Sequence, residues 1–202
     1  MLVRRKRADG LTVKQRLTLF HGTALSAEQA LSLPEDEITI DTLLRNGVKA
    51  LNVTAAGIRF VQLKELGATE AAQLRRIGFD ALHLVDPVMC GEANAAFGAA
   101  SVIETFLSTP QDAVALAGSE AVALLNLSPQ QLLEACAGAP TEAAAVLQQC
   151  SGHNVLDGVS VTTLLDTGLR APQLKQLGYN LASVLKLVSA NRSQILKLGF
   201  TL

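Results

Sequence analysis

Cysteine and histidine are the usual ligands of structural zinc sites, and the chain has three of each. The tightest grouping, Cys136, Cys150 and His153, offers three zinc ligands. A structural zinc site needs four ligands, usually supplied as two close pairs, and here only Cys150 and His153 form such a pair. We therefore predict no metal site, and we expect Cys90, Cys136 and Cys150 to be small buried thiols.

The sequence also lacks the motifs of common active sites. It contains no Gly-Lys-Ser or Gly-Lys-Thr of a phosphate-binding loop, no nucleophile elbow and no His-Glu-x-x-His zinc helix. His21, His83 and His153 lie far apart, so we expect surface or boundary residues rather than bases. We predict that the protein is not an enzyme and has no catalytic, cofactor-binding or metal-binding residues. An enzyme with an unrecognised site stays open as an alternative.

A glycine recurs about every ten residues through most of the chain. Starting at Gly47 and stepping by ten, with two steps of eleven, gives sixteen positions, of which eleven are glycine and three are serine. The whole chain has only 15 glycines, so we treat this register as an internal repeat. The glycines in the register are Gly47, Gly57, Gly67, Gly78, Gly98, Gly118, Gly138, Gly158, Gly168, Gly178 and Gly199.

The residues around each glycine are typical of a helix that ends and is followed at once by another. Glycine readily adopts the left-handed turn just past a helix C-terminus, and the next residue then packs on the position four before the glycine. We expect such pairs at Phe79 with Leu74, Tyr179 with Leu174 and Phe200 with Ile195. The four-before position is aliphatic in many units: Leu43, Leu63, Leu74, Val114, Leu124, Leu164, Leu174, Leu185 and Ile195.

Several units then place a small polar residue two positions after the glycine, where it can cap the next helix. This predicts N-caps at Thr69, Asp80, Ser160, Asn180, Asn191 and Thr201. In the middle units, Thr109-Pro110 and Ser128-Pro129 combine a hydroxyl cap with proline in the first helical position. Each unit is therefore about two turns of helix and a corner.

Such short helices are unstable alone in water and must bury their apolar sides against neighbouring units. We predict an all-α fold: a right- or left-handed solenoid, or superhelical array, of short two-turn helices with glycine corners. The repeat domain is expected over residues 38–202, after a basic N-terminal segment, 1–37, that is partly flexible or forms capping helices. The alternative is a compact all-helical domain, because the units between about 84 and 157 match poorly and some should fuse into longer helices.

The units "LKELGATEAAQLRRIGF" and "LKQLGYNLASVLKL" resemble the short tandem LKxLGF or LKxAGF decapeptide repeats of unicellular-eukaryote proteins. The resemblance covers residues 40 to 202, strongly at both ends and weakly in the middle. It implies a helical array that binds other macromolecules, and it carries over no catalytic residues. Mitochondrial termination-factor repeats share an LxxxGF turn, but their units are about three times longer.

Charge is strongly segregated along the chain, although the formal net charge is only −1. Residues 1–76 hold twelve Lys or Arg and eight Asp or Glu. Residues 77–169 hold ten acidic residues and no Lys or Arg, and residues 170–202 hold five basic residues and no acidic ones. In a stack this gives an acidic middle between basic ends. Such a surface favours a basic partner at the middle, an acidic partner at the ends, or contact between the end of one copy and the middle of another. The alternative is a solvated surface of uneven composition.

The termini and the cysteine content indicate the compartment. The first twenty residues hold a basic run, Arg4-Arg5-Lys6-Arg7, but no apolar core with a cleavage site, so we do not expect a secretory signal. Three cysteines form no disulfide framework, which favours an intracellular, cytoplasmic protein, with mitochondrial and nuclear locations left open. No apolar stretch is long enough to span a membrane. The last unit has no polar closing helix, which favours self-association.

These observations together favour a non-catalytic scaffold or adaptor that binds another protein, within a larger assembly. A nucleic-acid-binding repeat protein, acting through its basic N- and C-terminal units, is the alternative function. The acidic middle should repel nucleic acid, because binding to nucleic acid depends on Lys and Arg contacts to phosphate. We expect a protein partner, no cofactor and no membrane association.

Overall fold

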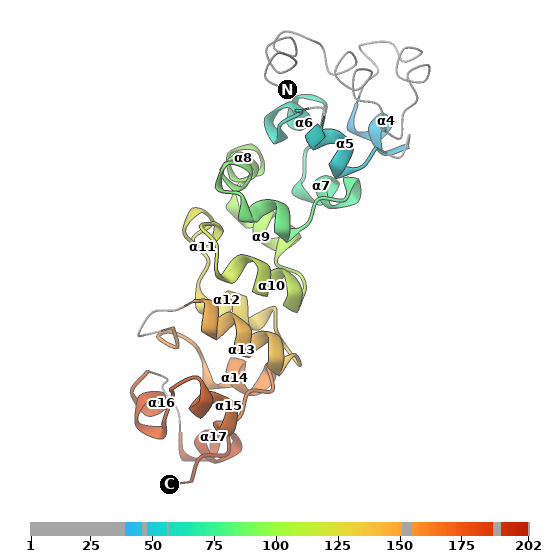
Figure 1. Ribbon diagram of the computed structural model, residues 1–202. Helices are drawn as coiled ribbons and strands as arrows, with labels where there is room; N and C mark the ends of the chain where they lie inside the picture. The colour runs from blue at the N-terminus through green and yellow to red at the C-terminus, as the bar shows by residue number, and fades with distance from the viewer. Residues whose placement is uncertain (1–38, 46–47, 56, 151–154, 188–190, 202) are drawn as a thin grey trace. The chain divides into compact units, whose positions relative to one another are not determined.

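The protein is described by a computed structural model over residues 39–45, 48–55, 57–150, 155–187 and 191–201. All regular structure in these ranges is helical, which confirms the predicted all-α class (Figure 1). The predicted N-terminal segment, 1–37, lies outside the described residues. The helices are α4 (Ile40–Arg45), α5 (Ala50–Ala55), α6 (Phe60–Glu65), α7 (Ala71–Ile77), the 3₁₀ helix η2 (Ala81–Val85), α8 (Pro87–Phe97), α9 (Ala99–Phe106), α10 (Pro110–Ala117), α11 (Ala121–Leu124), α12 (Pro129–Glu134), α13 (Pro140–Gln149), α14 (Val161–Asp166), α15 (Ala171–Gln176), α16 (Leu181–Leu187) and α17 (Arg192–Lys197).

The chain divides into two compact units. The first unit comprises the residues up to Asp80 together with Gly91–Thr105, and the second comprises Ala81–Cys90 and Phe106–Leu202. In the first unit, α4 packs against α7. In the second unit, α10 packs against η2 and α13, and α12 packs against α13 and α14. No helix in the described ranges is both long enough and apolar enough to cross a membrane.

The glycine corners form as the sequence predicts. The register glycines with a positive φ are Gly57, Gly67, Gly78, Gly98, Gly138, Gly158, Gly168, Gly178 and Gly199. Gly118 departs from the prediction, because it ends α10 with a φ of −96°. Gly47 lies outside the described residues.

Backbone hydrogen bonds close these corners on the residues that were predicted to pair. The N–H of Phe79 donates to the carbonyl of Leu74 at 3.1 Å, and the N–H of Tyr179 donates to that of Leu174 at 2.8 Å. The N–H of Phe200 likewise donates to the carbonyl of Ile195 at 3.3 Å. This is the bond that characterises a glycine-terminated helix, in which the residue after the glycine returns to the last turn.

Many of the short helices bury their first residue, their fourth residue or both, and these two positions are neighbours on one helical face. The buried first residues are Ile40, Ala50, Phe60, Ala71, Ala81, Val161 and Ala171. The buried fourth residues are Leu43, Val53, Leu63, Leu74, Leu84, Leu164, Leu174, Val184 and Ile195. In the first unit the rings of Phe60 and Phe79 meet edge to face, with centroids 4.9 Å apart. Two predicted core positions are wrong, since Leu124 and Leu185 are exposed.

Helix starts follow the predicted caps at several positions. The side chains of Thr109, Ser128, Ser160 and Asn191 each accept the backbone N–H three residues later. Thr69 is not a cap, because α7 begins one residue later, after Glu70. Prolines lie in the first turn of α8, α10, α12, α13 and α15, where their missing N–H costs no helical hydrogen bond.

A glutamine at the third helical position, which the pattern Ser128-Pro129-Gln130-Gln131 predicts at Gln131, also caps four other helices. Five helices carry a glutamine at their third residue, and its side-chain oxygen accepts the N–H of the residue just before the helix. These glutamines are Gln62, Gln73, Gln131, Gln173 and Gln194, with N···O distances of 2.9 to 3.2 Å. Two of the backbone N–H groups that donate to these glutamines belong to Arg59 and Arg170, whose own side chains form no capping hydrogen bond.

The middle units fuse where the prediction allowed it. Helix α8 has 11 residues and α13 has 10, and both run through register positions that lack glycine, Val88 and Gln148. In this region the position four before the register residue is not buried at Asn94, Glu104 or Glu134. Helix fusion accounts for the mismatch at Asn94, which lies in the 11-residue α8, but Glu104 and Glu134 lie in the shorter helices α9 and α12.

Long-range hydrogen bonds recur at a narrow range of sequence separations. In the first unit the N–H of Ile40 donates to the carbonyl of Leu66 at 2.9 Å. In the second, the N–H of Ala171 donates to the carbonyl of Leu198, and that of Gly138 to that of Asp166, both at 2.7 Å. These bonds span 26 to 28 residues, and long-range side-chain bonds within the same units span 30 to 33 residues. Both intervals correspond to about three repeat units.

Candidate functional site

A polar groove with a volume of about 280 Å³ lies between α12 and α14 in the second unit. The residues that line it carry hydroxyl, amide and carboxylate groups, and two of the lining side chains are apolar. The lining residues are Gln130, Leu133, Glu134, Ala137, Ser160, Thr162, Thr163 and Asp166. Pockets for drug-sized ligands and cofactors are larger on average and mostly apolar, so this groove suits one polar side chain better.

Gln130 organises the groove by joining α12 to the start of α14. Its amide nitrogen donates to Oε1 of Glu134 and to Oγ1 of Thr163, both at 2.6 Å. Its amide oxygen accepts the backbone N–H of Ser160 at 2.9 Å. All the hydrogen-bonding groups of this amide are therefore used inside the protein, and Gln130 acts as a fixed strut rather than a ligand-binding group.

The two hydroxyls at the start of α14 leave one proton for a further acceptor. Oγ of Ser160 accepts the N–H of Thr163 at 3.0 Å and lies 2.8 Å from Oγ1 of Thr163. Since Oγ1 of Thr163 also accepts from Gln130, the two hydroxyls share one of their protons, and the second is not used between them. The pair can therefore donate one hydrogen bond to a group outside it.

The groove carries negative charge that no nearby cation balances. Glu134 and Asp166 are both exposed, and no ion pair to either forms within the described residues. The nearest basic residue in sequence, Arg170, instead donates to the carbonyl of Leu169 at 2.8 Å. No histidine or cysteine is among the residues that line the groove. Its chemistry is that of binding a group that is cationic or rich in N–H donors.

The three cysteines are unsuited to nucleophilic chemistry. Cys90 and Cys136 are buried, as predicted, and Cys150 is partly buried, with its Sγ 3.5 Å from the carbonyl oxygen of Ala117. Burial raises the pKa of each thiol, and the pKa of Cys136 reaches about 11, with the charge of Glu142 adding to the effect. A raised pKa keeps a thiol protonated at neutral pH.

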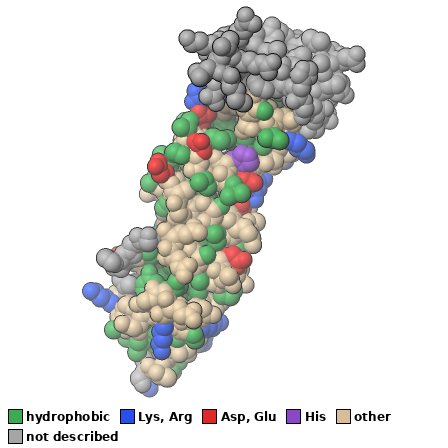
Figure 2. All heavy atoms as spheres, viewed as in Figure 1, with side chains coloured by type: hydrophobic (Ala, Val, Ile, Leu, Met, Phe, Trp, Pro, Cys, Tyr) green, Lys and Arg blue, Asp and Glu red, His purple; other side chains and the backbone are tan. Residues whose placement is uncertain are grey.

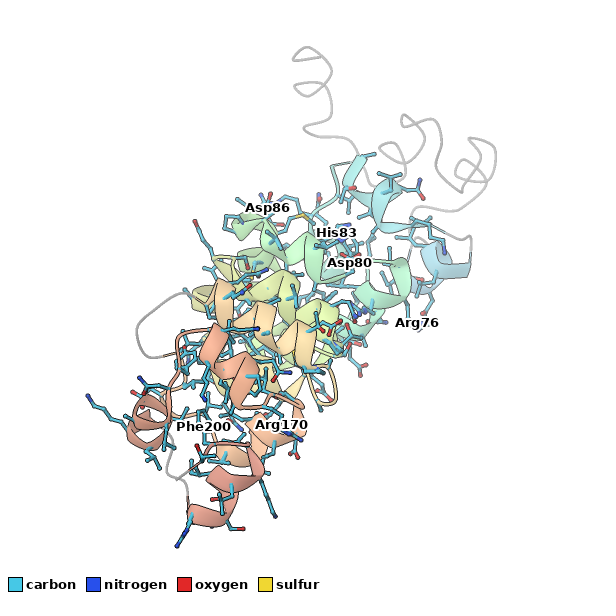
Figure 3. All side chains as sticks on the ribbon, turned by 60° about the horizontal axis from the view of Figure 1, so that its bottom comes forward. Arg76, Asp80, His83, Asp86, Arg170 and Phe200 are labelled. Atoms are coloured by element: carbon cyan, nitrogen blue, oxygen red, sulfur yellow. The ribbon has the colours of Figure 1, made fainter. Side chains whose placement is uncertain are left out.

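Of the three histidines, His83 is the one that lies within the described residues. His153 lies outside the described residues, as does His21. Among the residues described, no three His, Cys, Asp or Glu side chains are placed to hold a metal ion. His83 is half-buried on η2, and Figure 3 shows it one turn before Asp86, at the start of α8.

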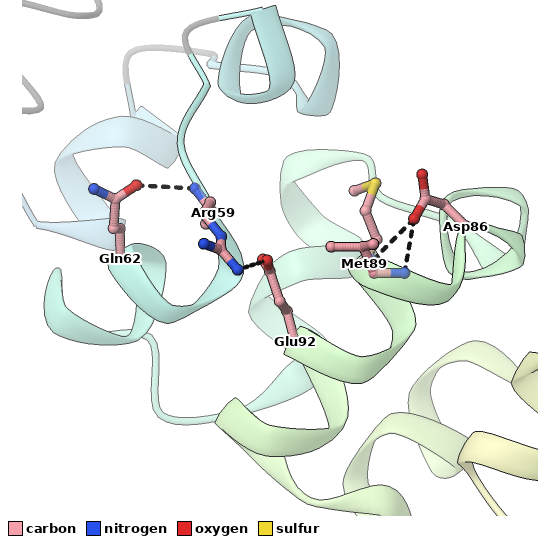
Figure 4. A network of polar contacts seen from close by, with 6 residues as sticks. Arg59, Gln62, Asp86, Met89 and Glu92 are labelled. Carbon is pink, nitrogen blue, oxygen red and sulfur yellow. Dashed lines mark hydrogen bonds and ion pairs between the residues drawn. The ribbon is translucent and has the colours of Figure 1, made fainter. Parts of the chain in front are cut away.

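An ion pair in the first unit joins two of its segments. Arg59, just before α6, pairs with Glu92 of α8, and this pairing raises the pKa of the Arg59 guanidinium (Figure 4). The backbone N–H of Arg59 is held at 3.0 Å by Gln62 (Figure 4). Lys64 reaches in the same direction, since its ammonium donates to the carbonyl of Ala96. These contacts fasten α6 to α8 within the first unit.

Exposed apolar side chains occur at two places in the second unit. Leu82, Val85 and Val88 lie on η2 and at the start of α8. Leu185 lies on α16 and Leu196 on α17. On the side shown in Figure 2, the Lys and Arg side chains of the second unit gather at its C-terminal helices.

The fold and these surfaces define a class: an all-helical chain of short, glycine-ended helices with a polar groove and exposed apolar side chains. No protein-family model, curated protein or solved structure matches the chain. The groove was not predicted from the sequence, because Ser128-Pro129-Gln130-Gln131 was interpreted only as a helix cap. One signal was available in the sequence. Gln131 caps the helix, so the side chain of the preceding Gln130 is not needed for the cap and can make other contacts.

Proposed function

We propose that the chain is a non-catalytic protein-binding module whose short helices stack as a solenoid with about three units in each turn. The observation that carries this proposal is the interval of 26 to 33 residues between hydrogen-bonded partners within each unit. An array in which every fourth ten-residue unit returns over the first would produce this interval. The likeness to tandem decapeptide repeats of the LKxLGF type supports the same arrangement.

The proposed partner is a protein with exposed Lys or Arg side chains. The groove between α12 and α14 supplies two carboxylates, Glu134 and Asp166, that have no ion-pair partner among the described residues. The surrounding segment, 77–169, contains no Lys or Arg that could compete for them. Opposite charge steers the approach of a partner and orients it on the surface. The scaffold function therefore rests on a specific acidic groove within a repeated helical frame.

The test is affinity purification of the tagged, full-length protein from its native cell, with and without nuclease. We expect a fixed set of proteins that survives nuclease treatment. Replacing both groove carboxylates, Glu134→Gln with Asp166→Asn, should reduce recovery of the main partner about tenfold or more, since charge-assisted hydrogen bonds are lost. A matched control, Glu120→Gln with Asp157→Asn, removes the same charge from exposed positions outside the groove and should leave recovery unchanged.

Two results would overturn the proposal. If the co-purified material is nucleic acid, or is lost with nuclease, the chain instead binds nucleic acid through its basic termini, and recovery should fall steeply with salt. If the groove variant and its control lose the partner equally, net charge rather than the groove determines binding.

A further inference from the structure

The groove between α12 and α14 restrains the orientation of one of its carboxylates. The amide nitrogen of Gln130 donates to Oε1 of Glu134 at 2.6 Å, and the same amide is bonded to the hydroxyl of Thr163 and the backbone N–H of Ser160. A carboxylate has about four lone-pair positions on its two oxygens, so one bond to Gln130 leaves both oxygens able to accept another. Glu134 therefore presents two acceptors whose orientation is set before a partner binds.

The second carboxylate of the groove comes from the other helix. Asp166 is the last residue of α14; it is exposed, and it forms no ion pair within the described residues. Helices α12 and α14 are in contact, and Figure 1 shows them close together. A ligand in the groove therefore meets carboxylates from two helices, with Leu133 and Ala137 as the apolar part of the lining.

These acceptors suit a guanidinium group better than an ammonium group. A guanidinium is planar and has five N–H donors in a rigid fork, so two donors can bond both oxygens of one carboxylate while others reach a second carboxylate. An ammonium is a compact, strongly hydrated charge with three donors, and it gains little from a carboxylate of fixed orientation. The weaker hydration of the guanidinium also suits a lining that is partly apolar.

We propose that the groove is an arginine-binding site, which takes one arginine side chain of the partner and discriminates against lysine. The guanidinium bonds both oxygens of Glu134 and an oxygen of Asp166. Gln130 is a positioning residue, since it keeps the Glu134 carboxylate in the orientation that the fork needs. The inference rests on the proposed function, because it narrows the basic partner to a protein that presents an exposed arginine.

Chemical-shift titration of the isotope-labelled, full-length protein with N-acetyl-arginine amide and with N-acetyl-lysine amide tests this selectivity. The two probes carry the same charge and the same main chain, and the backbone N–H signals of Ser160, Thr162 and Asp166 report on the groove. We expect the arginine probe to shift these signals with a dissociation constant of about 1 to 10 mM. The constant for the lysine probe should be about fivefold or more higher.

Gln130→Ala tests the role of the restrained carboxylate. Releasing Glu134 should weaken the arginine probe about threefold or more and the lysine probe by less, because only the fork requires a set orientation. Gln148→Ala, at an exposed position of α13, is the matched control and should change neither constant. Signals outside the groove that keep their positions show that each variant is folded.

The outcomes separate this inference from the proposed function. If the lysine probe binds as tightly as the arginine probe, or if Gln130→Ala leaves the ratio of the two constants unchanged, the arginine site is wrong, while capture of a basic partner by the groove still stands. If neither probe shifts the groove signals, or if Glu134→Gln with Asp166→Asn leaves the shifts as they were, the groove binds no basic side chain, and the acidic groove of the proposed function is wrong as well.

Discussion

A glycine at a corner of this protein is required because of its backbone conformation, and not because a side chain would lack space there. Gly178 has a φ of +89°, and a Cβ built there would meet no atom within 4 Å. Gly118 occupies the same place in another unit with a negative φ, and a Cβ there would meet only the end of the flexible Gln149 side chain closely. Substitutions at the two positions therefore distinguish the effect of backbone strain from the effect of steric crowding.

Gly178→Ala should lower the free energy of unfolding by about 1 to 2 kcal/mol, because a side chain makes the left-handed conformation unfavourable. Gly118→Ala should leave stability unchanged or raise it slightly, since its φ suits alanine and the unfolded chain loses freedom. Urea unfolding of the two variants beside the wild type measures the difference. Equal losses at both positions would contradict the conformational explanation.

The buried thiol of Cys136 makes stability depend on alkaline pH. Its pKa in the folded protein is about 11, above the ordinary value of 9.0, so the unfolded chain loses this proton first as the pH rises. Between pH 9 and 11 the folded state holds more protons than the unfolded state, and the free energy of unfolding must fall. Burial shifts the pKa of Cys90, Cys150 and Tyr179 in the same direction.

Cys136→Ala should therefore show a shallower loss of stability between pH 9 and 11 than the wild type. At pH 7 the same variant should be less stable by about 1 kcal/mol, because a buried sulfur is removed from the core. Urea unfolding at several pH values provides both numbers. A slope identical to that of the wild type would mean that Cys136 does not titrate in this range.

At the scale of the helix, the features that could be predicted from the sequence are those set by residues close together in the chain. Glycine corners, proline in first turns and hydroxyl caps all follow from backbone hydrogen bonding within a few residues, and these were found at Gly178, Pro129 and Ser160. Burial at Leu124 and Leu185 was predicted wrongly, because position in the repeat does not determine which helical face a neighbour covers. The groove depends on Gln130 meeting Thr163, 33 residues away, and no local pattern reports such a contact.

Gln130 is the side chain that joins two of these elements. Gln130→Ala removes two donated bonds and one accepted bond, and it leaves the nearly buried hydroxyl of Thr163 without its amide donor. We expect a loss of about 1 to 2 kcal/mol in the free energy of unfolding. Gln148→Ala, at an exposed position of α13, should change stability by less than about 0.5 kcal/mol. Denaturant unfolding of both variants distinguishes a strut between helices from a general effect of losing glutamine.

At the scale of the whole molecule, the segregation of charge opposes folding at low salt. The segment 77–169 holds ten acidic residues and no Lys or Arg. Glu92 pairs with Arg59 from outside the segment, and we expect dissolved ions to screen much of the remaining repulsion. We expect the melting temperature to rise by several degrees between about 20 mM and 500 mM NaCl. The Glu120→Gln, Asp157→Asn variant should respond less. A melting temperature that falls with salt would show that ion pairs such as Arg59–Glu92 dominate instead.

The interval between bonded partners also bears on how the chain is made. The long-range hydrogen bonds found within the described residues join positions 26 to 33 residues apart. Contacts between residues so close in sequence favour fast folding. During synthesis at roughly 5 to 20 residues per second, the most distant of these partners emerges from the ribosome within about 2 to 7 seconds of the first. Each stretch of helices can therefore complete its bonds while the next is still being translated, without waiting for the C-terminus.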